Sequence, residues 1–516
     1  MSSEPSRGAI TATLVITSMM VLIDTTIANV ALPKMMGTLG ATSNQITWVL
    51  TSYTMAEAVM IPLAGYFTRR IGERKLLLIS IVGFIITSAL SGQADSLGEI
   101  VFFRILQGLF GASAVPLSQS LLVQVYPKEE RGKAMAIFTV GVLFGPILGP
   151  VIGGVITQHM SWRWVFYVNA PVGLICLYMI YRNIKISNIG KATVDWLIAI
   201  SMAVGIGLLQ MVLSVGNQDN WFNSNFVLYS FVLSLVALTF FIGRSIITKA
   251  SIAPVWMLAN RNLAVACFSV AGFAVCTFGI LQLQPMMLQE LLNYPVETSG
   301  LVMSPRGIAS ALLLFSIASR MDKIDARILI FIGLCLNFTG VWFMTQYSLQ
   351  ASMFWMIFPE IIQGAGMGML FASLSRMAFA TLPPELSTDG AALFSLCRTL
   401  GASFGIAMTN TYFSRVKQAE WNSLGGALSP DNPIFQQFAE SQHAQLTDPT
   451  FLQQIANMVE RQSTMLAFVI SFGMFLYIYL INMLLIPLFK KPSEKEPPSQ
   501  VQSQTKLTHP ETKPAS

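Results

Sequence analysis

The sequence predicts an all-helical integral membrane protein, and two observations support this prediction. Of the 516 residues, 53% are hydrophobic and only 11% are charged, whereas about a quarter of the residues of an ordinary soluble domain are charged. The apolar residues also gather in windows of about 20, the length that an α-helix needs to cross a bilayer. Because such windows recur along the chain, we expect a bundle of transmembrane helices.

Fourteen windows qualify as spans. The first is too long for a cleaved signal peptide and has no small-residue cleavage site, so we retain it as a transmembrane helix. In chain order the predicted spans are residues 10–32, 46–68, 76–94, 99–122, 132–157, 164–183, 195–215, 226–247, 262–284, 299–318, 327–346, 353–379, 388–414 and 463–488.

Lys and Arg gather in alternate loops, which predicts the orientation of the spans. The short loops on the other side of the membrane contain little more than Lys34 and Arg163. Because cytoplasmic loops carry the excess of Lys and Arg, we expect residues 1–9 and the tail 489–516 in the cytoplasm. The tail is rich in Pro, Ser, Lys and Gln, a composition typical of disorder. The net charge of +6 then reflects topology rather than binding to nucleic acid.

An internal repeat predicts how the spans are organised. The loop at residues 64–77 resembles the loop at 318–329, and their alignment places Arg69 opposite Asp322. Parallel repeats of six helices are a known way to build a secondary transporter. We therefore expect two six-helix bundles and, between them, two inserted linker helices. The predicted domains are residues 10–183, 195–247 and 262–488.

Metal and nucleotide chemistry find no support in the sequence. The five cysteines all fall inside predicted spans without metal-ligand spacing, and the three histidines are scattered. No GxxxxGK[ST] phosphate loop or hydrolase motif is present. If the protein transports a solute uphill, we expect the energy to come from an ion gradient, without a cofactor.

Several motifs together carry a family resemblance. They are LIDTTIANVALP (22–33), WVLTSYTMAEAVMIPLAG (48–65), FRILQGLFGAS (103–113), GVLFGPILGPVIGG (141–154), WRWVFYVNAPVG (162–173), LQPMMLQELLNY (283–294), MSPRG (303–307) and PPELSTDGAALFSLCRTLGASFG (383–405). With this set in this order, the chain resembles the fourteen-helix drug/proton antiporters of the major facilitator superfamily, most closely the EmrB/QacA-type multidrug efflux permeases.

The resemblance implies a function. It implies proton-driven export of hydrophobic or amphipathic drugs and toxins across the bacterial inner membrane. It also implies a periplasmic membrane-fusion adaptor and an outer-membrane channel as partners. The alternatives are a proton-coupled symporter, a lipid or fatty-acid exporter of the same fold, and a receptor that transports nothing, since fold does not imply function.

Three charged residues inside spans are candidates for proton coupling. Asp24 and Arg104 have opposite signs, and a charge at this depth is a functional hypothesis by default because its insertion is costly. Arg104 does not deprotonate, so we expect it to tune a neighbouring carboxylate; a structural salt bridge is the alternative. Glu57 lies at mid-depth and is either a proton carrier or a lining residue that attracts cationic drugs.

The fifth span carries a glycine face. Gly141, Gly145, Gly149 and Gly153 recur every four residues, which allows close approach of a neighbouring helix. Pro146 and Pro150 would loosen the hydrogen-bond ladder. The resemblance implies that this helix, which also includes Gly154, is the antiporter motif; a packing seam without directional meaning is the alternative.

The resemblance also implies gating at the cytoplasmic loops. The residues involved are Gly65, Arg69, Arg70, Gly72, Arg74, Asp322 and Arg327. The superfamily usually has Asp where this chain has Arg69, so the usual salt bridge is not expected in the first half. Asp322 is expected to retain the equivalent bridge in the second half.

A drug pocket is predicted from interleaved aromatic, amide and charged residues. The candidates are Gln107, Phe273, Phe278, Gln284, Glu290, Arg306, Glu360 and Arg398. We expect Glu290 and Glu360 nearer the outer membrane interface, and Arg398 is a buried charge without a recognisable partner. Residues 415–462 form a long outer loop with helical spacing of apolar residues. This spacing predicts a small helical cap that meets an adaptor. A mobile connector is the alternative.

Overall fold

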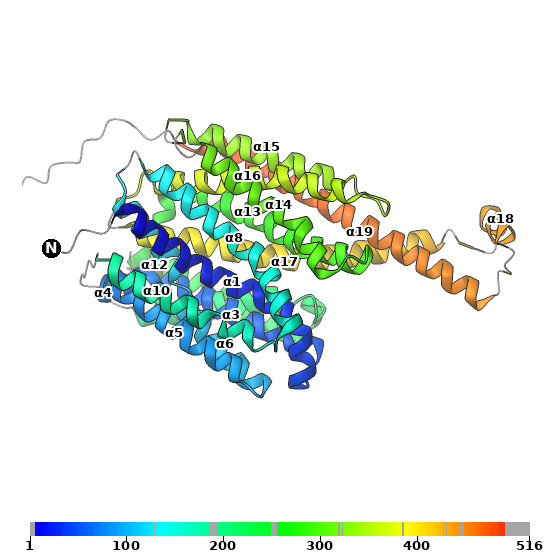
Figure 1. Cartoon of the computed structure of the whole chain (residues 1–516), viewed down its shortest axis with the longest axis horizontal. Helices are drawn as coiled ribbons and strands as arrows, with labels where there is room; N and C mark the ends of the chain where they lie inside the picture. Colours follow the sequence, from blue (N-terminus) through cyan, green and yellow to red (C-terminus); the bar gives the residue numbers. More distant parts are fainter. Residues whose placement is uncertain are drawn as a thin grey trace, which may run out of the picture.

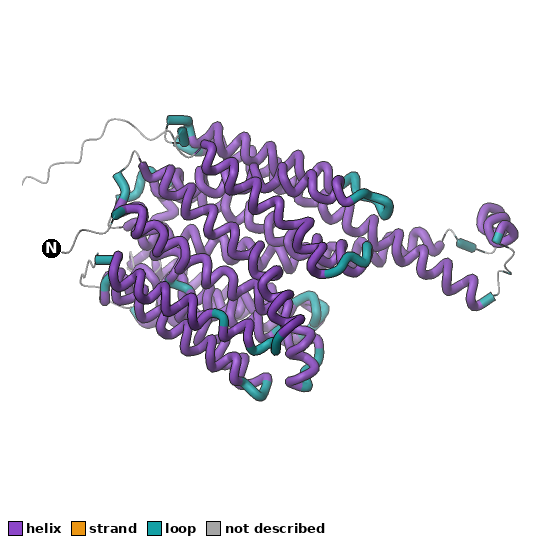
Figure 2. Tube along the Cα trace, in the orientation of Figure 1, coloured by secondary structure: helices purple, strands orange, loops and turns teal. Residues whose placement is uncertain are grey.

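The structure is a computed structural model that describes most of the chain. The described residues are 6–127, 130–185, 195–248, 255–317, 320–321, 323–383, 386–426, 428–429, 431–442, 445 and 448–490. Within these ranges the secondary structure consists of helices joined by short turns, without a strand (Figure 2). The all-helical prediction is confirmed for this part of the chain.

The first half of the chain forms one group of packed helices. Its elements are α1 (Arg7–Leu39), α2 (Ser43–Ile46), α3 (Trp48–Met60), η1 (Ile61–Leu63), α4 (Ala64–Ile71), α5 (Glu73–Gln93), α6 (Leu97–Gly111), α7 (Ala114–Val125), α8 (Arg131–His159), α9 (Trp164–Tyr167) and α10 (Asn169–Asn183). In this half α1 packs along α8, α3 along α6, and α5 against both α6 and α10.

Two linker helices follow. They are α11 (Trp196–Val215) and α12 (Asn225–Thr248), separated by a turn that contains η3 (Trp221–Asn223). The two helices pack on each other, and α11 also contacts α3 and α17 (Ser387–Gly426). The linker pair therefore lies beside the seam between the two halves.

The second half repeats the packing order of the first. Its elements are η4 (Val255–Ala259), α13 (Arg261–Met286), the π-helical turn η5 (Met287–Leu291), α14 (Val296–Ile317), α15 (Ala326–Met344), α16 (Met353–Phe379), α17, α18 (Pro433–Ser441), α19 (Pro449–Leu485) and η7 (Ile486–Leu488). Here α13 packs along α17, α14 along α16, and α15 against α16 and α19. This order matches α1–α8, α3–α6 and α5–α6–α10.

The predicted count of fourteen spans is not confirmed. Among the residues described, 12 helices are long and apolar enough to cross a membrane. The two predicted spans outside this set are both helical. Residues 46–68 are divided by the short turn η1, which contains Pro62, and residues 132–157 lie in the 29-residue helix α8. Proline interrupts the backbone hydrogen bonding of a helix, which explains the division of the second predicted span.

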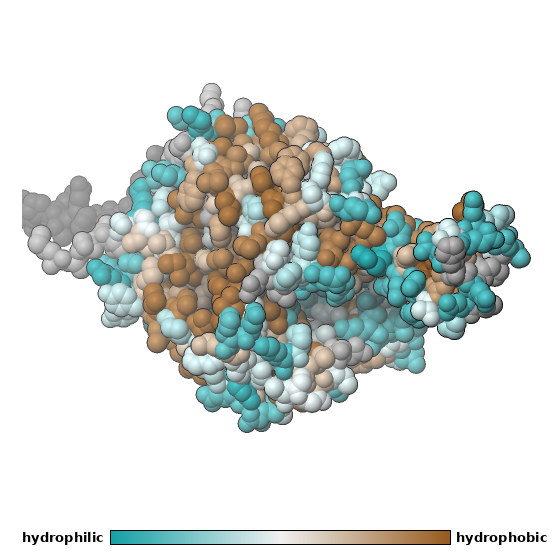
Figure 3. All heavy atoms as spheres, turned by 45° about the vertical axis from the view of Figure 1, so that its right-hand side comes forward, coloured by the Kyte–Doolittle hydropathy of each residue, from teal (hydrophilic) through white to brown (hydrophobic). Residues whose placement is uncertain are grey.

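The bundle has two distinct ends (Figure 1). The start of α1 and the end of α19 lie at one end, which we call the terminal end. At the other end α17 and α19 continue beyond the bundle toward α18, and we call this projection, residues 415–462, the hairpin. On the face that Figure 3 shows, a broad apolar surface covers the middle of the bundle, and polar residues gather at the ends and on the hairpin. This distribution is the one expected of a membrane protein.

The hairpin has its own small apolar core. It is formed by Phe435, Ala439, Phe451, Ile455 and Val459, with Leu424 and Leu428 packed against them. Lys417 on α17 also forms an ion pair of 2.5 Å with Glu460 on α19. The outer loop is thus helical, as predicted: α18 packs with the extensions of α17 and α19 around a core of its own.

Candidate functional site

A buried polar network lies in the first half, around Asp24 on α1. Its carboxylate lies 2.6 Å from Nη1 of Arg104 on α6, and both side chains are almost fully buried. Asp24 also accepts hydrogen bonds from Gln107 Nε2 at 3.0 Å and Asn169 Nδ2 at 2.6 Å. The predicted proximity of Asp24 and Arg104 is therefore present in the structure. Asn169 was missed, although it is a polar residue within a predicted span.

Arg104 is held on several sides. Its Nε donates to the carbonyl oxygen of Val49 at 3.1 Å, and its Nη1 donates to Gln107 Oε1 at 2.9 Å. The guanidinium lies 4.2 Å from the ring centroid of Tyr53, within cation–π range. A charge fixed in this way is costly to leave without its partner, so the network is a rigid unit.

A second buried network lies in the other half, around Glu360 on α16. Glu360 lies 2.8 Å from Nε of Arg306 on α14, and Arg306 Nη2 donates to Glu360 Oε1 at 2.9 Å. Gln284 Nε2 donates to the same carboxylate oxygen at 2.6 Å. Gln363 accepts a 3.3 Å hydrogen bond from Arg306. Glu360 is fully buried, where residues of α13 and α14 bind its carboxylate; its position near the outer end of its span stays a prediction.

The two networks occupy matching places in the repeat. Arg104 and Gln107 lie in the segment RILQG of α6, and Glu360 and Gln363 lie in the segment EIIQG of α16. The glycines that end these segments both pack closely against the backbone of a neighbouring helix. A Cβ atom on Gly108 would meet the carbonyl oxygen of Tyr53, and one on Gly364 would meet that of Arg306. Sequence reasoning missed this repeated segment, because the basic Arg104 of the first half is replaced by the acidic Glu360 in the second.

Glu57 and Arg398 are buried charged residues that lie on opposite halves. Glu57 on α3 and Arg398 on α17 lie within electrostatic range of each other, without an ion pair or hydrogen bond between them among the described contacts. Arg398 therefore has an electrostatic partner that sequence reasoning did not identify. The signal was missed because these residues are distant in the chain and lie in different predicted domains.

A small central cavity lies between the halves, with a volume of about 50 Å³. Its walls come from both halves and are mostly apolar. They include Leu22, Val142, Phe273, Thr277, Phe278, Leu281, Arg306, Met367, Phe371 and Arg398. Ligand pockets for drug-sized molecules are roughly 300–1,000 Å³, so the halves must separate before the cavity can hold one. Of the predicted pocket residues, Phe273, Phe278, Arg306 and Arg398 line this cavity, and Glu290 lies exposed elsewhere.

The predicted glycine face of α8 packs against α1. A Cβ atom on Gly145 would lie 2.8 Å from Leu22 Cβ, and one on Gly153 would lie 2.9 Å from the Ile27 side chain. Gly141 and Gly149 similarly meet Val15 and Thr26, and the Gly154 carbonyl accepts a hydrogen bond from Thr157. The side chains of Pro146 and Pro150 lie outside the described part of the structure. The glycines thus fix the helix that carries Asp24 close to α8.

Polar contacts join the two halves at the terminal end. Arg69 on α4 forms an ion pair with Asp389 on α17, and Gly65 gives Asp389 the space to approach α4. Ser120 on α7 lies 2.9 Å from Ser387 Oγ and 2.7 Å from Thr388 Oγ1. Arg69 is thus paired although the family aspartate is absent, and its partner Asp389 was missed. Asp389 lies in the motif at residues 383–405, near the start of α17.

The other predicted gating residues have separate positions. Gly72 adopts φ +84°, a conformation that favours glycine. Arg74 donates to the Tyr181 carbonyl oxygen at 2.8 Å, and Arg70 is exposed. Arg327 lies at the start of α15, where its backbone N–H is capped by Asp325. Asp322 lies outside the described residues.

Comparisons with known proteins agree with this architecture. The family model of the Major Facilitator Superfamily matches residues 14–406. The chain is 31% identical to the multidrug export protein EmrB of Escherichia coli K12, over 95% of this chain and 97% of that protein. It is 31% identical to EmrB of Haemophilus influenzae, over 83% of this chain and 85% of that protein. It is 32% identical to the fatty acid resistance protein FarB of Neisseria gonorrhoeae, covering 90% and 92%.

Two solved transporters share the fold. The human organic anion transporter MFSD10 aligns with a TM-score of 0.61 at 11% identity, covering 94% of this chain and all of that chain. The proton:xylose symporter XylE aligns with a TM-score of 0.57 at 14% identity, covering 94% and 99%.

Proposed function

This chain belongs to the Major Facilitator Superfamily and, within it, to the EmrB-type multidrug efflux permeases, and we propose that it couples efflux to the inward movement of protons. The observation that carries this proposal is the pair Glu57 and Arg398. A buried titratable carboxyl group on one half lies within electrostatic range of a buried guanidinium on the other, so protonation of Glu57 changes the attraction between the halves.

The coupling follows from the sign of that change. When Glu57 is ionised, its attraction to Arg398 stabilises the state in which the terminal end is closed. Protonation of Glu57 removes this attraction, which favours separation of the halves at the terminal end. The empty carrier then returns to the cytoplasmic side with a proton. Loss of the proton, together with substrate binding, restores the pair and sends the substrate outward.

The two buried networks keep this movement rigid. Asp24 and Arg104 tie α1 to α6, while Arg306 and Glu360 tie α14 to α16. Each half then moves as a body, and the contacts that break lie between the halves. In this proposal Asp24 and Arg104 tune Glu57 electrostatically, since both act on it at a distance.

We assign the terminal end to the cytoplasm of the bacterial cell and the hairpin to the outer side of the inner membrane. Arg69, Arg70 and Arg74 at the terminal end support this orientation through the distribution of positive charge. We also count α3 with α4, and α8, as spans, which gives fourteen crossings. Both termini then lie on the cytoplasmic side.

The substrates that we propose are hydrophobic and amphipathic drugs and toxins. Phe273, Phe278 and Met367 offer apolar, adaptable walls, and Arg306 and Arg398 offer cationic groups. Export of fatty acids, the compounds named for the gonococcal relative, is the second candidate, because a carboxylate attached to an apolar chain fits such walls.

We further propose that the hairpin docks a periplasmic membrane-fusion adaptor linked to an outer-membrane channel. The hairpin projects beyond the bundle (Figure 1), and Ile434 and Met458 expose 77% and 57% of their surface there. These exposed apolar side chains are available to pack against an adaptor.

Proton counting on purified protein tests the coupling. Adding substrate to weakly buffered wild-type protein in detergent should release protons if substrate and proton bind in alternation. Uptake of protons on substrate addition would indicate a symporter. Substrate binding without any proton exchange, over a range of pH, would contradict coupling of either kind.

A further inference from the structure

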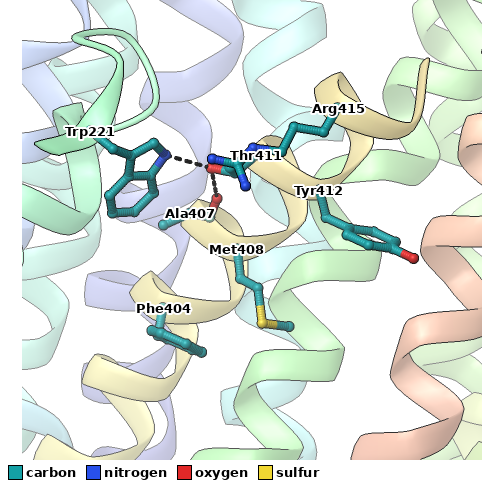
Figure 4. Close-up of a pocket in the computed structure, with 7 residues that line it drawn as sticks. All are labelled: Trp221, Phe404, Ala407, Met408, Thr411, Tyr412 and Arg415. Atoms are coloured by element: carbon teal, nitrogen blue, oxygen red, sulfur yellow. Dashed lines mark hydrogen bonds between the residues drawn. The ribbon is translucent and has the colours of Figure 1, made fainter. Parts of the chain in front are cut away.

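A groove at the hairpin end lies apart from the central cavity. It is lined by α17 and by Trp221 from the turn between the two linker helices (Figure 4), and its volume is about 280 Å³. Phe404, Met408 and Tyr412 follow one another along α17 at one-turn intervals and form one apolar wall. Trp221 from the linker turn forms the other wall. Among the lining residues, Arg415 is the charged one.

Trp221 is fixed in place by its surroundings. Its indole N–H donates to Thr411 Oγ1 at 2.9 Å, and that hydroxyl lies 3.2 Å from Asn217 Oδ1. Trp221 and the preceding Asn220 both have positive φ angles, 53° and 55°, which are rare for a bulky residue. The linker turn is therefore shaped to hold an aromatic wall against α17.

The groove spans the depth of one membrane leaflet. With a rise of 1.5 Å per residue, Phe404 lies about 25 Å and Arg415 about 42 Å along α17 from Ser387 at the terminal end. A hydrocarbon core is about 30 Å thick, and the headgroup regions extend the bilayer to about 40–45 Å. With Ser387 taken as the level of the membrane surface at the terminal end, Phe404, which exposes 49% of its surface, falls at the depth of the acyl chains, and Arg415 falls at that of the headgroups.

Arg415 is available for a ligand. It is exposed, and no hydrogen bond or ion pair is found for it within the described ranges. In contrast, the nearby Lys417 is paired with Glu460 on α19. Figure 4 shows the Arg415 side chain extending back toward Thr411 and Trp221, over the end of the groove.

We propose that this groove is a binding site for an anionic phospholipid of the outer leaflet. The acyl chain lies along Phe404 and Met408, and the phosphate binds Arg415, whose guanidinium is suited to phosphate oxygens. Tyr412 and Trp221 lie at the interface depth where such side chains are enriched. The bound lipid joins the linker turn to α17, the helix that carries Asp389 and Arg398. The choice of leaflet rests on the orientation proposed above, and the site itself does not depend on proton coupling.

Native mass spectrometry of the full-length protein, with titrated lipids, tests this site. Phosphatidylglycerol is the anionic probe, and phosphatidylcholine with the same acyl chains is the neutral control. We expect wild type to retain phosphatidylglycerol in preference to phosphatidylcholine. Arg415→Gln should weaken the retention of phosphatidylglycerol by about fivefold, the effect typical of one cation near anionic lipid.

Two further variants separate this site from a general charge effect. Lys417→Gln removes a positive charge two residues away, outside the groove, and should leave retention unchanged. Met408→Trp fills the groove without changing charge and should also weaken retention, and thermal unfolding in detergent verifies that each variant is folded. Equal retention of the two lipids by wild type, or equal losses in Arg415→Gln and Lys417→Gln, would overturn the proposal.

Discussion

Arg69 on α4 forms an ion pair with Asp389 on α17, and this pair joins the two halves at the terminal end. Asp389 is buried, whereas Arg69 retains access to water. The pair therefore opposes separation of the halves at this end. We propose that the pair acts as a gate, with a charge on α4 opposite in sign to the aspartate expected from the family resemblance.

A charge exchange tests the gate. Arg69→Asp places two carboxylates together, so the terminal end should open more readily and transport should fall. The double variant Arg69→Asp with Asp389→Arg restores opposite charges and should recover much of the activity. Labelling of a cysteine introduced at Ser120, which lies beside the gate, reports on opening. Arg70→Asp, at an exposed position, is the control. No recovery in the double variant would refute the electrostatic role.

The pair Asp24 and Arg104 should contribute strongly to stability. Asp24→Asn leaves a buried guanidinium without its counter-charge, which typically costs about 3–5 kcal/mol. Adding Arg104→Gln removes the unpaired charge and should restore part of the thermal stability without restoring coupled transport. Thermal unfolding in detergent and transport in vesicles measure the two effects separately. An Asp24→Asn variant as stable as wild type would contradict the assigned network.

The glycine at the end of the RILQG segment should not tolerate a side chain. Gly108→Ala introduces a Cβ atom against the Tyr53 carbonyl oxygen and Ala56, and overpacking of this kind costs about 1–3 kcal/mol. Gly98→Ala on the same helix meets no atom within 4 Å and is the matched control. Gly364→Ala should reproduce the loss in the second half. The unfolding temperatures of the three variants provide the comparison.

The hairpin should be separable from transport. Because its apolar core is its own, replacing residues 422–457 by a short Gly/Ser linker should leave the bundle folded. Drug-stimulated proton movement in vesicles should survive, while association with the adaptor in a pull-down should weaken. Intact adaptor binding by the shortened protein would show that the hairpin is not the docking element.

The sequence was sufficient for the helical fold and for the charged pair on α1 and α6. Apolar windows fix the approximate depth of each residue, so Asp24 and Arg104 could be placed at similar levels. Windows do not fix helix rotation or neighbours, which is why Asn169 and Asp389 were missed and the partners of Glu360 were not identified. Helical periodicity also did not reveal that α17 and α19 continue past the membrane, because amphipathic extensions resemble a separate loop helix.

Proton release by the variant Glu57→Gln tests the central claim most directly. Glutamine keeps the size and polarity of Glu57 but cannot exchange a proton, so the variant should bind substrate without releasing protons and should not concentrate substrate in response to a pH gradient. Glu290→Gln, at an exposed position, should behave as wild type. Substrate-induced proton release of wild-type size from the folded Glu57→Gln protein, with normal gradient-driven export in vesicles, would contradict the account.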